Sequence, residues 1–521
     1  MTGPVASAPP LLARVRMLLG RALQVYGGGP PAHALRDAAV RLDEPLRVAI
    51  AGRLKAGKST LLNALVGQEL AATDAGECTR IVTWFRDGHT YRVMAHPRHG
   101  PPRQLPPGPS GSLLDVDLGG WRAEDVDRLV VDWPSAALRT LTLVDTPGMD
   151  SLSTEISGRS ETALGTDEGA GSQVDAVVYL MRHVHTSDIR FLEAFRDDPA
   201  ERRPINTIGV LGRADEVGHG RPEALESAAR VARRYSEDPR VRGLCQTVLP
   251  VAGLLAVTAA TLREDEFRAL GAVAAAPEVD RERLLLTAGR FVGADDAFGL
   301  SHEQRAALLD RFGLFGVRLG TRLVVSGVAT TAGALSRELL DRSGLVPLRE
   351  ALATRFAARA EVLKARSALL TAEAVLRRHP VDPASGLDRE LEQISASAHE
   401  FAEVRLLDRL RAGELMLTDQ ERRDAECLLG AEGVDPASRL ALPAEAPSAD
   451  HVRAAQAALT RWQRRAEHPT SVREVRDAAR VLVRTCEGLL LGATGWSPPR
   501  PAPAGPVAPV HPARPGAGVR R

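Results

Sequence analysis

The segment GRLKAGKS, residues 52–59, has the residue types and the spacing of a loop that binds the phosphates of a nucleotide. It fits the pattern of a glycine, four free residues, a second glycine, a lysine and a serine or threonine. Gly52 and Gly57 let the backbone bend so that its N–H groups, and the N-terminus of a following helix, face the phosphates. We expect Lys58 to reach the β- and γ-phosphates and the Ser59 hydroxyl to ligate Mg²⁺.

Two elements must position this loop. LRVAIA, residues 46–51, is typical of a short buried strand, and TLLNALV, residues 60–66, is typical of the start of an amphipathic helix. A glycine-rich turn formed by chance is the alternative, but the strand and the helix are the context that the motif requires. The candidate nucleotide contacts are Gly52, Arg53, Leu54, Lys55, Ala56, Gly57, Lys58, Ser59 and Thr60.

A second motif, Asp145-Thr146-Pro147-Gly148, directly follows an apolar run at residues 141–145 that predicts a strand. A carboxylate at the end of a strand can hold Mg²⁺ through a water molecule, and the Gly148 N–H can bond the γ-phosphate. Residues 149–172 are rich in Gly, Ser and Thr, as expected for a switch that responds to that phosphate. An ordinary turn is the alternative, and the position after a strand argues against it.

TDAGECTR, residues 73–80, lies between the two motifs and offers two threonines for the Mg²⁺ shell. We favour Thr79, because it comes just before a predicted strand, and Thr73 is the rival. The expected metal ligands are Ser59, Thr79 and, through water, Asp145. The expected catalytic residues are Lys55, Lys58, Thr79 and Gly148.

GRAD, residues 212–215, follows an apolar run at residues 205–211 that predicts another strand. Guanine-specific proteins carry Asn or Thr, Lys, any residue and Asp at this place. Asp215 keeps the carboxylate that accepts hydrogen bonds from guanine N1 and N2, and the stem of Arg213 can cover the base. Gly212 has no side chain to brace the loop, so we expect guanine to be preferred over adenine but bound weakly.

QTVLPVAG, residues 246–253, is typical of a last strand followed by a loop whose backbone N–H can meet guanine O6. The candidate contacts to the base are Arg213, Ala214, Asp215, Val251, Ala252 and Gly253. With the phosphate loop and Asp145, they predict a site for GTP or GDP with Mg²⁺.

Length, net charge and lysine usage limit what kind of protein this chain can be. Its 521 residues are enough for two or three domains, and a formal net charge of +1 gives no sign of a nucleic-acid partner. Three of the 67 Lys and Arg residues are lysines, namely Lys55, Lys58 and Lys364. Two of them lie in the phosphate loop, where ammonium and guanidinium groups are not interchangeable.

Cysteine usage and hydropathy favour a cytoplasmic protein. The four cysteines, Cys78, Cys245, Cys427 and Cys486, form no CxxC pair, so a disulfide framework or a zinc site is not expected. The sequence has no run of 18 or more apolar residues and no pattern of a secretory signal. Any contact with a membrane is therefore expected to be peripheral.

Residues 48–85, the DTPG and GRAD motifs and PVAGLLA at residues 250–256 together resemble a bacterial dynamin-like GTPase, in particular the isoniazid-inducible class of actinobacteria. The resemblance extends over residues 11–492 and is strongest in the nucleotide-binding part. It implies a GTPase head on an α-helical stalk, head-to-head dimerisation through the nucleotide, and action at membranes. A paralogous dynamin-like protein is a further partner that it suggests.

One departure from the family lies in the phosphate loop. Dynamins usually carry Gln-Ser at its third and fourth positions, where this chain has Leu54 and Lys55. The usual positioning of water and the usual monovalent cation site are therefore in doubt. Guanylate-binding relatives of dynamin project an arginine finger from the fourth position, so we expect Lys55 to compensate charge on the phosphates. A solvated surface charge, or an ion pair across the dimer, is the alternative role.

The expected fold is an α/β P-loop GTPase domain, with a mixed, mostly parallel sheet flanked by helices, on an all-α helical-bundle stalk built from both chain ends. The expected divisions are residues 1–44, an N-terminal helical arm of the stalk; 45–345, the GTPase domain with a helical extension; 346–495, the stalk; and 496–521, a disordered Pro-rich basic tail. Residues 11–42 should fold back onto the helices after Pro347 and share one bundle with residues 471–491.

Smaller patterns predict local structure. Asp87-Gly88 predicts the turn of a β-hairpin, and residues 97–109 are typical of a proline-rich surface loop. An apolar stripe over residues 347–379 predicts one continuous helix. Capping boxes are expected at residues 301–304, 418–421 and 471–474. LALP, residues 440–443, is the first candidate for membrane contact and residues 379–386 the second, with a plain surface loop as the alternative.

The expected function is GTP hydrolysis with Mg²⁺, coupled to dimerisation or higher oligomerisation through the head and to peripheral binding and remodelling, fusion or fission of an anionic membrane. The expected location is the cytoplasm, at the inner face of the cell membrane. Two alternatives stay open. A regulatory GTP-binding switch or scaffold with negligible turnover is favoured by the missing Gln. An RNA- or ribosome-associated GTPase is disfavoured by the near-zero charge and the lack of a recognisable RNA-binding module.

Overall fold

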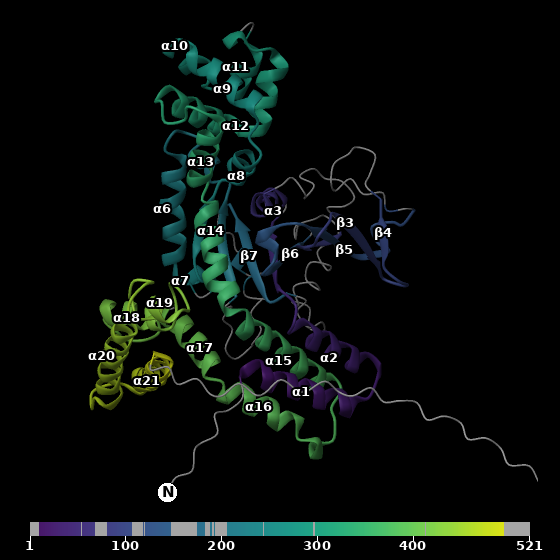
Figure 1. Ribbon diagram of the computed structural model, residues 1–521, viewed down its shortest axis with the longest axis vertical. Helices are drawn as coiled ribbons and strands as arrows, with labels where there is room; N and C mark the ends of the chain where they lie inside the picture. Colours follow the sequence, from purple (N-terminus) through teal and green to yellow (C-terminus); the bar gives the residue numbers. More distant parts are fainter. Residues whose placement is uncertain are drawn as a thin grey trace, which may run out of the picture.

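The computed structural model describes residues 10–53, 55–67, 81–106, 118, 120–146, 174–182, 188–189, 192, 206–242, 244–294, 297–411 and 413–493. A nine-stranded sheet lies at the centre of this part of the chain, in the order β4-β3-β5-β2-β6-β1-β7-β8-β9 (Figure 1). Its strands are β1 (Leu46–Gly52), β2 (Val82–Asp87), β3 (Arg92–Pro97), β4 (Arg103–Leu105), β5 (Val126–Trp133), β6 (Leu141–Asp145), β7 (Ala176–Met181), β8 (Thr207–Gly212) and β9 (Val248–Val251).

The strand directions confirm a mixed, mostly parallel sheet. The five neighbours β6, β1, β7, β8 and β9 are parallel to one another. β2 is antiparallel to β6 but parallel to β5, and β3 is antiparallel to both β5 and β4. Every residue of β7 and β8 is buried, as expected for strands covered on both faces. Helices α3 (Lys58–Val66) and α14 (Leu345–Ala351) pack against one face, and α6 (Ala224–Glu237) against the other.

Two local predictions at the edge of the sheet are wrong. Asp87-Gly88 does not close a β-hairpin, because β5 lies between β2 and β3 and pairs with both. Residues 97–109 are not only a surface loop, since they contain β4, which pairs with β3. Alternation along a strand predicts which face is buried but not which strand lies beside it, and so these pairings have no local signal.

Helices α9 (Glu264–Ala275), α10 (Glu278–Leu284), α11 (Ala288–Gly293), α12 (His302–Val325) and α13 (Ala332–Arg342) form a helical extension beyond one end of the sheet, at the top of Figure 1. Its core is continuous with that of the sheet, because Phe312 and Leu339 share an apolar cluster with Ala228 of α6. The extension is therefore packed onto the nucleotide-binding part of the chain.

The three predicted capping boxes have different outcomes. The boxes that begin α12 at Ser301 and α18 (Asp419–Leu428) at Thr418 are confirmed, because each hydroxyl accepts a hydrogen bond from the backbone three residues later and that residue's side chain accepts one in return. The box at residues 471–474 is wrong. The Ser471 hydroxyl donates instead to the carbonyl oxygen of Arg465, 3.0 Å away.

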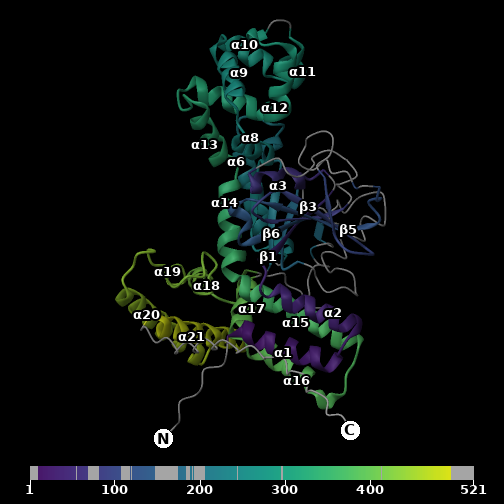
Figure 2. The ribbon, with the colours of Figure 1, turned by 45° about the vertical axis from the view of Figure 1, so that its right-hand side comes forward.

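The stalk is built from both ends of the chain (Figure 2). In its first cluster, α1 (Leu11–Tyr26) and α2 (Gly29–Arg41) pack with α15 (Ala360–Arg378) and α16 (Leu387–Ser397). Its second cluster contains α17 (His399–Arg411), α18, α20 (Ser448–Glu467) and α21 (Arg473–Ala493), with the short α19 (Pro436–Arg439) beside α18. The N-terminal helices thus fold back as expected, but the prediction that residues 471–491 share their bundle is wrong, since α21 belongs to the second cluster.

The helix predicted over residues 347–379 is interrupted, so its continuity is wrong. A π-helical turn (Leu352–Phe356) and a 3₁₀ turn (Ala357–Arg359) separate α14 from α15. The Arg359 side chain donates to the carbonyl oxygens of Leu429 and Gly430 just beyond α18. The second stalk cluster therefore contacts the chain at the point where its helical geometry changes.

The LALP segment is not free of packing partners. Leu440 lies against the second stalk cluster, and the Leu442 N–H donates to the carbonyl oxygen of Ala437, 2.9 Å away. The packing of Leu440 contradicts the premise that the leucines of this segment have no face to bury. In the described part of the chain, no helix is long and apolar enough to cross a bilayer.

Candidate nucleotide site

The phosphate loop joins the end of β1 to the start of α3, as the sequence predicts. Gly52 has a φ of 147°, and a Cβ there would lie 2.5 Å from the carbonyl oxygen of Leu180 on β7. Gly57 has a φ of 99° and gives α3 an N-terminus with no side-chain cap. Both positions require glycine, and the N-terminus of α3, where helix N–H groups can bind an anion, lies at the phosphate loop.

The two lysines of the loop differ in environment. Lys58 is 9% exposed, and its Nζ donates to the carbonyl oxygens of Gly52 and Arg53, at 3.1 and 3.2 Å. Lys55 is exposed and has a φ of 62°, in the left-handed region that side chains seldom adopt. The loop therefore presents one buried ammonium group and one at its surface.

Asp145 ends β6, which lies directly beside β1, so its carboxylate reaches the start of α3. Burial raises its pKa to about 6, although the Lys58 ammonium and a hydrogen bond from Ser59 lower it. Its Oδ1 is buried and has no hydrogen-bond partner among the described residues. The following Thr146 is fixed by a 3.0 Å hydrogen bond from its Oγ1 to the carbonyl oxygen of Ile50. A buried, unpartnered carboxylate oxygen beside a serine hydroxyl fits a divalent cation.

The base motif, GRAD at residues 212–215, begins at Gly212, the last residue of β8. Asp215 lies in a 3₁₀ turn (Ala214–Glu216) and is 9% exposed. Burial is the largest influence on its pKa and raises it, as does the neighbouring Glu216, whereas Arg213 and Arg182 lower it. Arg213 has a φ of 53°, and its Nη1 donates to Glu216 Oε1 at 2.7 Å. The motif therefore presents one buried carboxylate and one that is paired with arginine.

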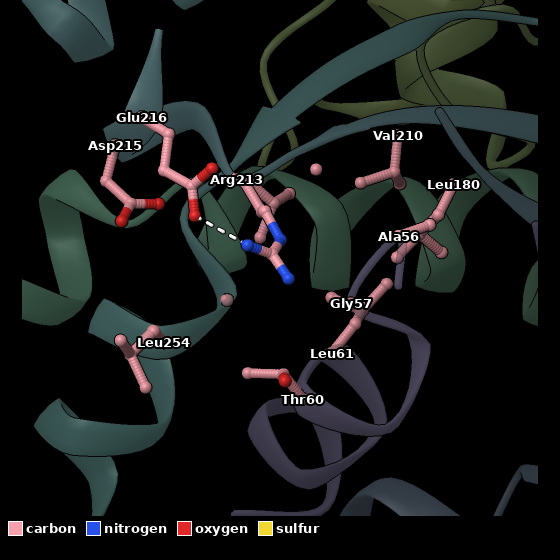
Figure 3. Close-up of a pocket in the computed structure, with 13 residues that line it drawn as sticks. Ala56, Gly57, Thr60, Leu61, Leu180, Val210, Arg213, Asp215, Glu216 and Leu254 are labelled. Carbon is pink, nitrogen blue, oxygen red and sulfur yellow. Dashed lines mark hydrogen bonds and ion pairs between the residues drawn. The ribbon is translucent and has the colours of Figure 1, made fainter. Parts of the chain in front are cut away.

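A cavity of about 170 Å³ connects the phosphate loop with the base motif (Figure 3). Its walls come from the loop and α3, from the ends of β7 and β8, and from the first turn of α8 (Gly253–Ala260). Among the predicted contacts, those that line it are Ala56, Gly57, Thr60, Arg213, Asp215, Val251 and Gly253.

Comparison with known proteins decides the family. A family model described as 50S ribosome-binding GTPase matches residues 47–209. Isoniazid-induced protein IniC of Mycobacterium tuberculosis is 40% identical over 485 residues, which cover 92% of this chain and 98% of that protein. A bacterial dynamin-like protein of Nostoc punctiforme is 30% identical over 149 residues, 26% of this chain and 20% of that protein. The chain belongs to the IniC family of bacterial dynamin-like GTPases.

Two solved structures of an oligomerised bacterial dynamin pair, described as providing a mechanism for sensing and tethering membranes over long range, also resemble this dynamin-like GTPase. One has a TM-score of 0.33 and 13% identity and covers 93% of this chain and 79% of that chain. The other has a TM-score of 0.29 and 12% identity and covers 93% and 74%. The assignment rests on the sequence relatives and on the GTPase family model, and it makes this protein a GTPase whose ligand is a guanine nucleotide.

Several predicted site residues of this dynamin-like GTPase lie elsewhere or are not described. Ala252 is fully buried, and its N–H donates to the carbonyl oxygen of Ser343 at 2.8 Å, so this N–H is not available to guanine O6. Ala214 is buried outside the cavity lining, and Lys58, Ser59 and Asp145 gather at the phosphate end. Outside the described residues lie Leu54, Thr73, Thr79, Gly148 and residues 149–172.

Sequence reasoning missed part of the cavity wall. Leu61, Leu180, Val210, Glu216 and Leu254 also line it. Leu180 is the last residue but one of β7, a parallel strand next to β1. The carboxyl ends of such strands meet at one edge of the sheet, so this signal was available. The only signal for Glu216 was its place beside Asp215.

The structure gives a reason for glycine at position 212 that the motif alone does not reveal. A Cβ at this position would lie 2.9 Å from the carbonyl oxygen of Ala56 in the phosphate loop. The base motif of this dynamin-like GTPase therefore approaches the phosphate loop backbone to backbone. Where guanine-specific proteins carry Asn or Thr, this arrangement leaves no room for a side chain.

Proposed function

We propose that this dynamin-like GTPase binds GTP together with Mg²⁺ and couples hydrolysis to pairing of GTPase heads and to peripheral binding of a membrane, which it remodels, fuses or severs. The observation that carries the proposal is the cavity that joins the phosphate loop to Asp215. A buried lysine and a helix N-terminus without a side-chain cap lie beside its phosphate end, and its base end has a buried carboxylate. A triphosphate linked to a base with two N–H donors matches both ends.

The two ends have distinct roles in binding. Lys58 is held inside the loop by backbone carbonyl oxygens, where its charge is placed for the β- and γ-phosphates. Asp215 accepts hydrogen bonds from guanine N1 and N2, a pair of donors that adenine lacks. The stem of Arg213 covers the face of the base.

The residues present fit Mg²⁺. Ser59 and, through water, Asp145 would hold it, with Thr79 as the expected further ligand. Bound there, Mg²⁺ would neutralise charge on the phosphate oxygens. The buried Oδ1 of Asp145, which has no partner among the described residues, supports this role. A pKa of about 6 leaves most of this carboxyl group ionised at neutral pH.

Contacts between the head and α14 support coupling to the stalk. The Ala252 N–H donates to the carbonyl oxygen of Ser343, just before α14. The Arg349 side chain on α14 donates to the carbonyl oxygens of Ala64 and Leu65, at 3.0 and 3.2 Å, in the last turn of α3. Because α3 begins at the phosphate loop, a displacement of α3 by nucleotide would move the helix that leads into the stalk.

The proposed partners are a second copy or a paralogous dynamin-like protein at the head, and an anionic membrane at the stalk. The location that we propose with these partners is the cytoplasm, at the inner face of the cell membrane. Met416, between α17 and α18, is 83% exposed and replaces Leu440 as the first candidate for lipid contact. A regulatory switch with negligible turnover is the second candidate function, because Leu54 and Lys55 stand where dynamins carry Gln and Ser.

Phosphate release and liposome flotation together test the proposal with the full chain. We expect Mg²⁺-dependent phosphate release, and flotation with anionic vesicles that is greater with GTP than with GDP. Lys58→Ala should lose both, whereas Met416→Asp should lose flotation alone. GTP binding without phosphate release would favour the switch, and flotation that does not depend on nucleotide would contradict the coupling.

Base specificity needs its own measurement. Asp215→Asn should bind xanthosine triphosphate in preference to GTP, because the C2 carbonyl oxygen of xanthine accepts a hydrogen bond from an asparagine amide. ATP bound more tightly than GTP by the unmodified protein would contradict the assignment of Asp215 to guanine.

A further inference from the structure

Glu216 lies in the cavity wall beside Asp215 and is paired there with Arg213 (Figure 3). Its carboxylate is shared with a second arginine, Arg182. Its Oε1 accepts from Arg213 Nη1 at 2.7 Å, and its Oε2 accepts from Arg182 Nη2. Arg182 directly follows β7 and Arg213 directly follows β8. Glu216 therefore joins the carboxyl ends of two neighbouring strands above the base end of the cavity.

The same two arginines act on Asp215. Burial and the charge of Glu216 raise the pKa of Asp215, and the charges of Arg213 and Arg182 lower it. Two adjacent carboxylates thus compete for two guanidinium groups. Among the described residues, both arginines form their ion pairs with the exposed Glu216 rather than with the buried Asp215.

We propose that Glu216 is a positioning residue for base specificity: it holds Arg213 and Arg182 away from the Asp215 carboxylate and so keeps that carboxylate open to guanine N1 and N2. The inference rests on the proposed binding of GTP at this cavity. It adds a fifth position, directly after the four residues of the base motif, to those that decide which base is bound.

Electrostatic attraction would draw Arg213 to Asp215 if Glu216 lost its charge. An ion pair between exposed groups is weak, whereas the attraction of a guanidinium to a buried carboxylate is screened less. Once released from Glu216, Arg213 would find the stronger acceptor in Asp215, only two residues away. The arginine would then occupy the hydrogen-bonding sites that guanine needs.

The test compares the affinity of the full chain for GTP and for inosine triphosphate, which lacks the N2 amino group. Glu216→Gln should weaken GTP binding by about threefold to tenfold and shrink the preference for GTP over inosine triphosphate. Adding Arg213→Ala to Glu216→Gln should restore most of that preference, because it removes the competing guanidinium that lies two residues from Asp215 and leaves only Arg182. Glu237→Gln, an exposed glutamate at the end of α6, is the matched control and should change nothing.

Each outcome decides a different point. A loss of affinity in the same proportion for both nucleotides, without restoration by Arg213→Ala, would mean a merely structural role and would overturn the inference. An unchanged ratio in Glu216→Gln, with GTP still bound by the unmodified protein, would overturn it while leaving the proposed function intact. Absence of GTP binding by the unmodified protein would overturn both.

Discussion

The backbone N–H of Ala252 donates to the carbonyl oxygen of Ser343 over 2.8 Å, and this bond ties the loop after β9 to the segment that enters α14. Ala252 stands between Val251 and Gly253, which line the nucleotide cavity. Ser343 directly precedes Gly344, the N-cap of α14. The base end of the site and the path into the stalk are therefore joined by one backbone contact.

Gly344→Ala should break this junction. Gly344 has a φ of 80°, and a Cβ there would lie 2.1 Å from the carbonyl oxygen of Pro250 on β9. Because neither backbone can yield without moving β9, we expect unfolding to become easier by at least about 3 kcal/mol and GTP binding to weaken. Thermal unfolding and nucleotide titration measure the two effects.

Gly327→Ala is the control for Gly344→Ala, since Gly327 has a φ of 72° but no heavy atom within 4 Å of the added Cβ. It should cost only the backbone strain, about 1 to 2 kcal/mol, and an equal loss in both variants would contradict the importance of the close approach.

Gly212→Ala should disturb the nucleotide site. The added Cβ would lie 2.9 Å from the carbonyl oxygen of Ala56 and push the phosphate loop away from the base motif. We expect GTP binding to weaken about tenfold, equivalent to about 1.4 kcal/mol. Gly271→Ala on α9, outside the cavity, is the control, because a Cβ at Gly271 would meet no heavy atom within 4 Å. Equal affinities for the two variants would sink this explanation of Gly212.

Asp145→Asn should stabilise the nucleotide-free protein while weakening nucleotide binding. Burial raises the pKa of Asp145 from 3.8 to about 6, so the native state binds this proton more tightly than the unfolded chain does. The contribution of this group to stability therefore falls as pH rises from about 4 to 6 and stays low above 6. At pH 8 we expect the variant to be more stable by about 1 to 3 kcal/mol, measured by denaturant unfolding.

The affinity for nucleotide with Mg²⁺ should depend on pH in the opposite sense from the stability contribution of Asp145. In the unmodified protein it should fall as pH drops through about 6, because protonation removes the ligand charge. Asp145→Asn should bind weakly at every pH and show a flat profile. A variant with unaltered affinity at pH 8 would exclude Asp145 from the metal shell.

Glu403→Gln should loosen the second stalk cluster. Burial raises the pKa of Glu403, but His399, Arg439 and the Thr485 hydroxyl together lower it from 4.5 to about 2. Its contribution is therefore fully present above pH 4.5 and is lost as pH falls toward 2. We expect the substitution to cost about 2 to 4 kcal/mol at pH 7, measured by thermal unfolding. Glu400→Gln, exposed on the same helix, should change stability by less than about 0.5 kcal/mol. A loss that persisted undiminished at pH 2 would contradict the ionic origin.

Lys55→Ala and Lys55→Arg test the proposed charge compensation. Lys55 is exposed and holds a φ of 62°, a strain of about 1 to 3 kcal/mol that a functional demand would explain. We expect Lys55→Ala to lower turnover at least about tenfold with nucleotide affinity retained, at protein concentrations that span dimerisation. Lys55→Arg should keep part of the activity. Unchanged turnover in Lys55→Ala would remove this lysine from catalysis.

Local patterns in the sequence determined the strands, the phosphate loop and the position of Asp215. A strand covered on both faces is a short continuous apolar run, and a phosphate loop needs glycines, a lysine and a hydroxyl at fixed spacing, so both signals lie within a few residues. The same holds for the caps at Ser301 and Thr418, whose partners are three residues away. For Lys364, composition suggested only that its retention is unusual; the structure shows its Nζ bound to the carbonyl oxygens of Leu42 and Glu44, just beyond α2.

Tertiary structure alone decided the contacts between residues far apart in the chain. β5 separates β2 from β3 because strand pairing depends on the whole sheet, and alternation within each strand is the same for any neighbour. The Ala252 N–H is taken by Ser343, and Arg182 reaches Glu216 across the ends of two strands, through contacts that span 91 and 34 positions. The need for glycine at position 212 is also decided by tertiary structure. A side chain there would clash with the carbonyl oxygen of Ala56, which lies more than 150 residues earlier in the chain.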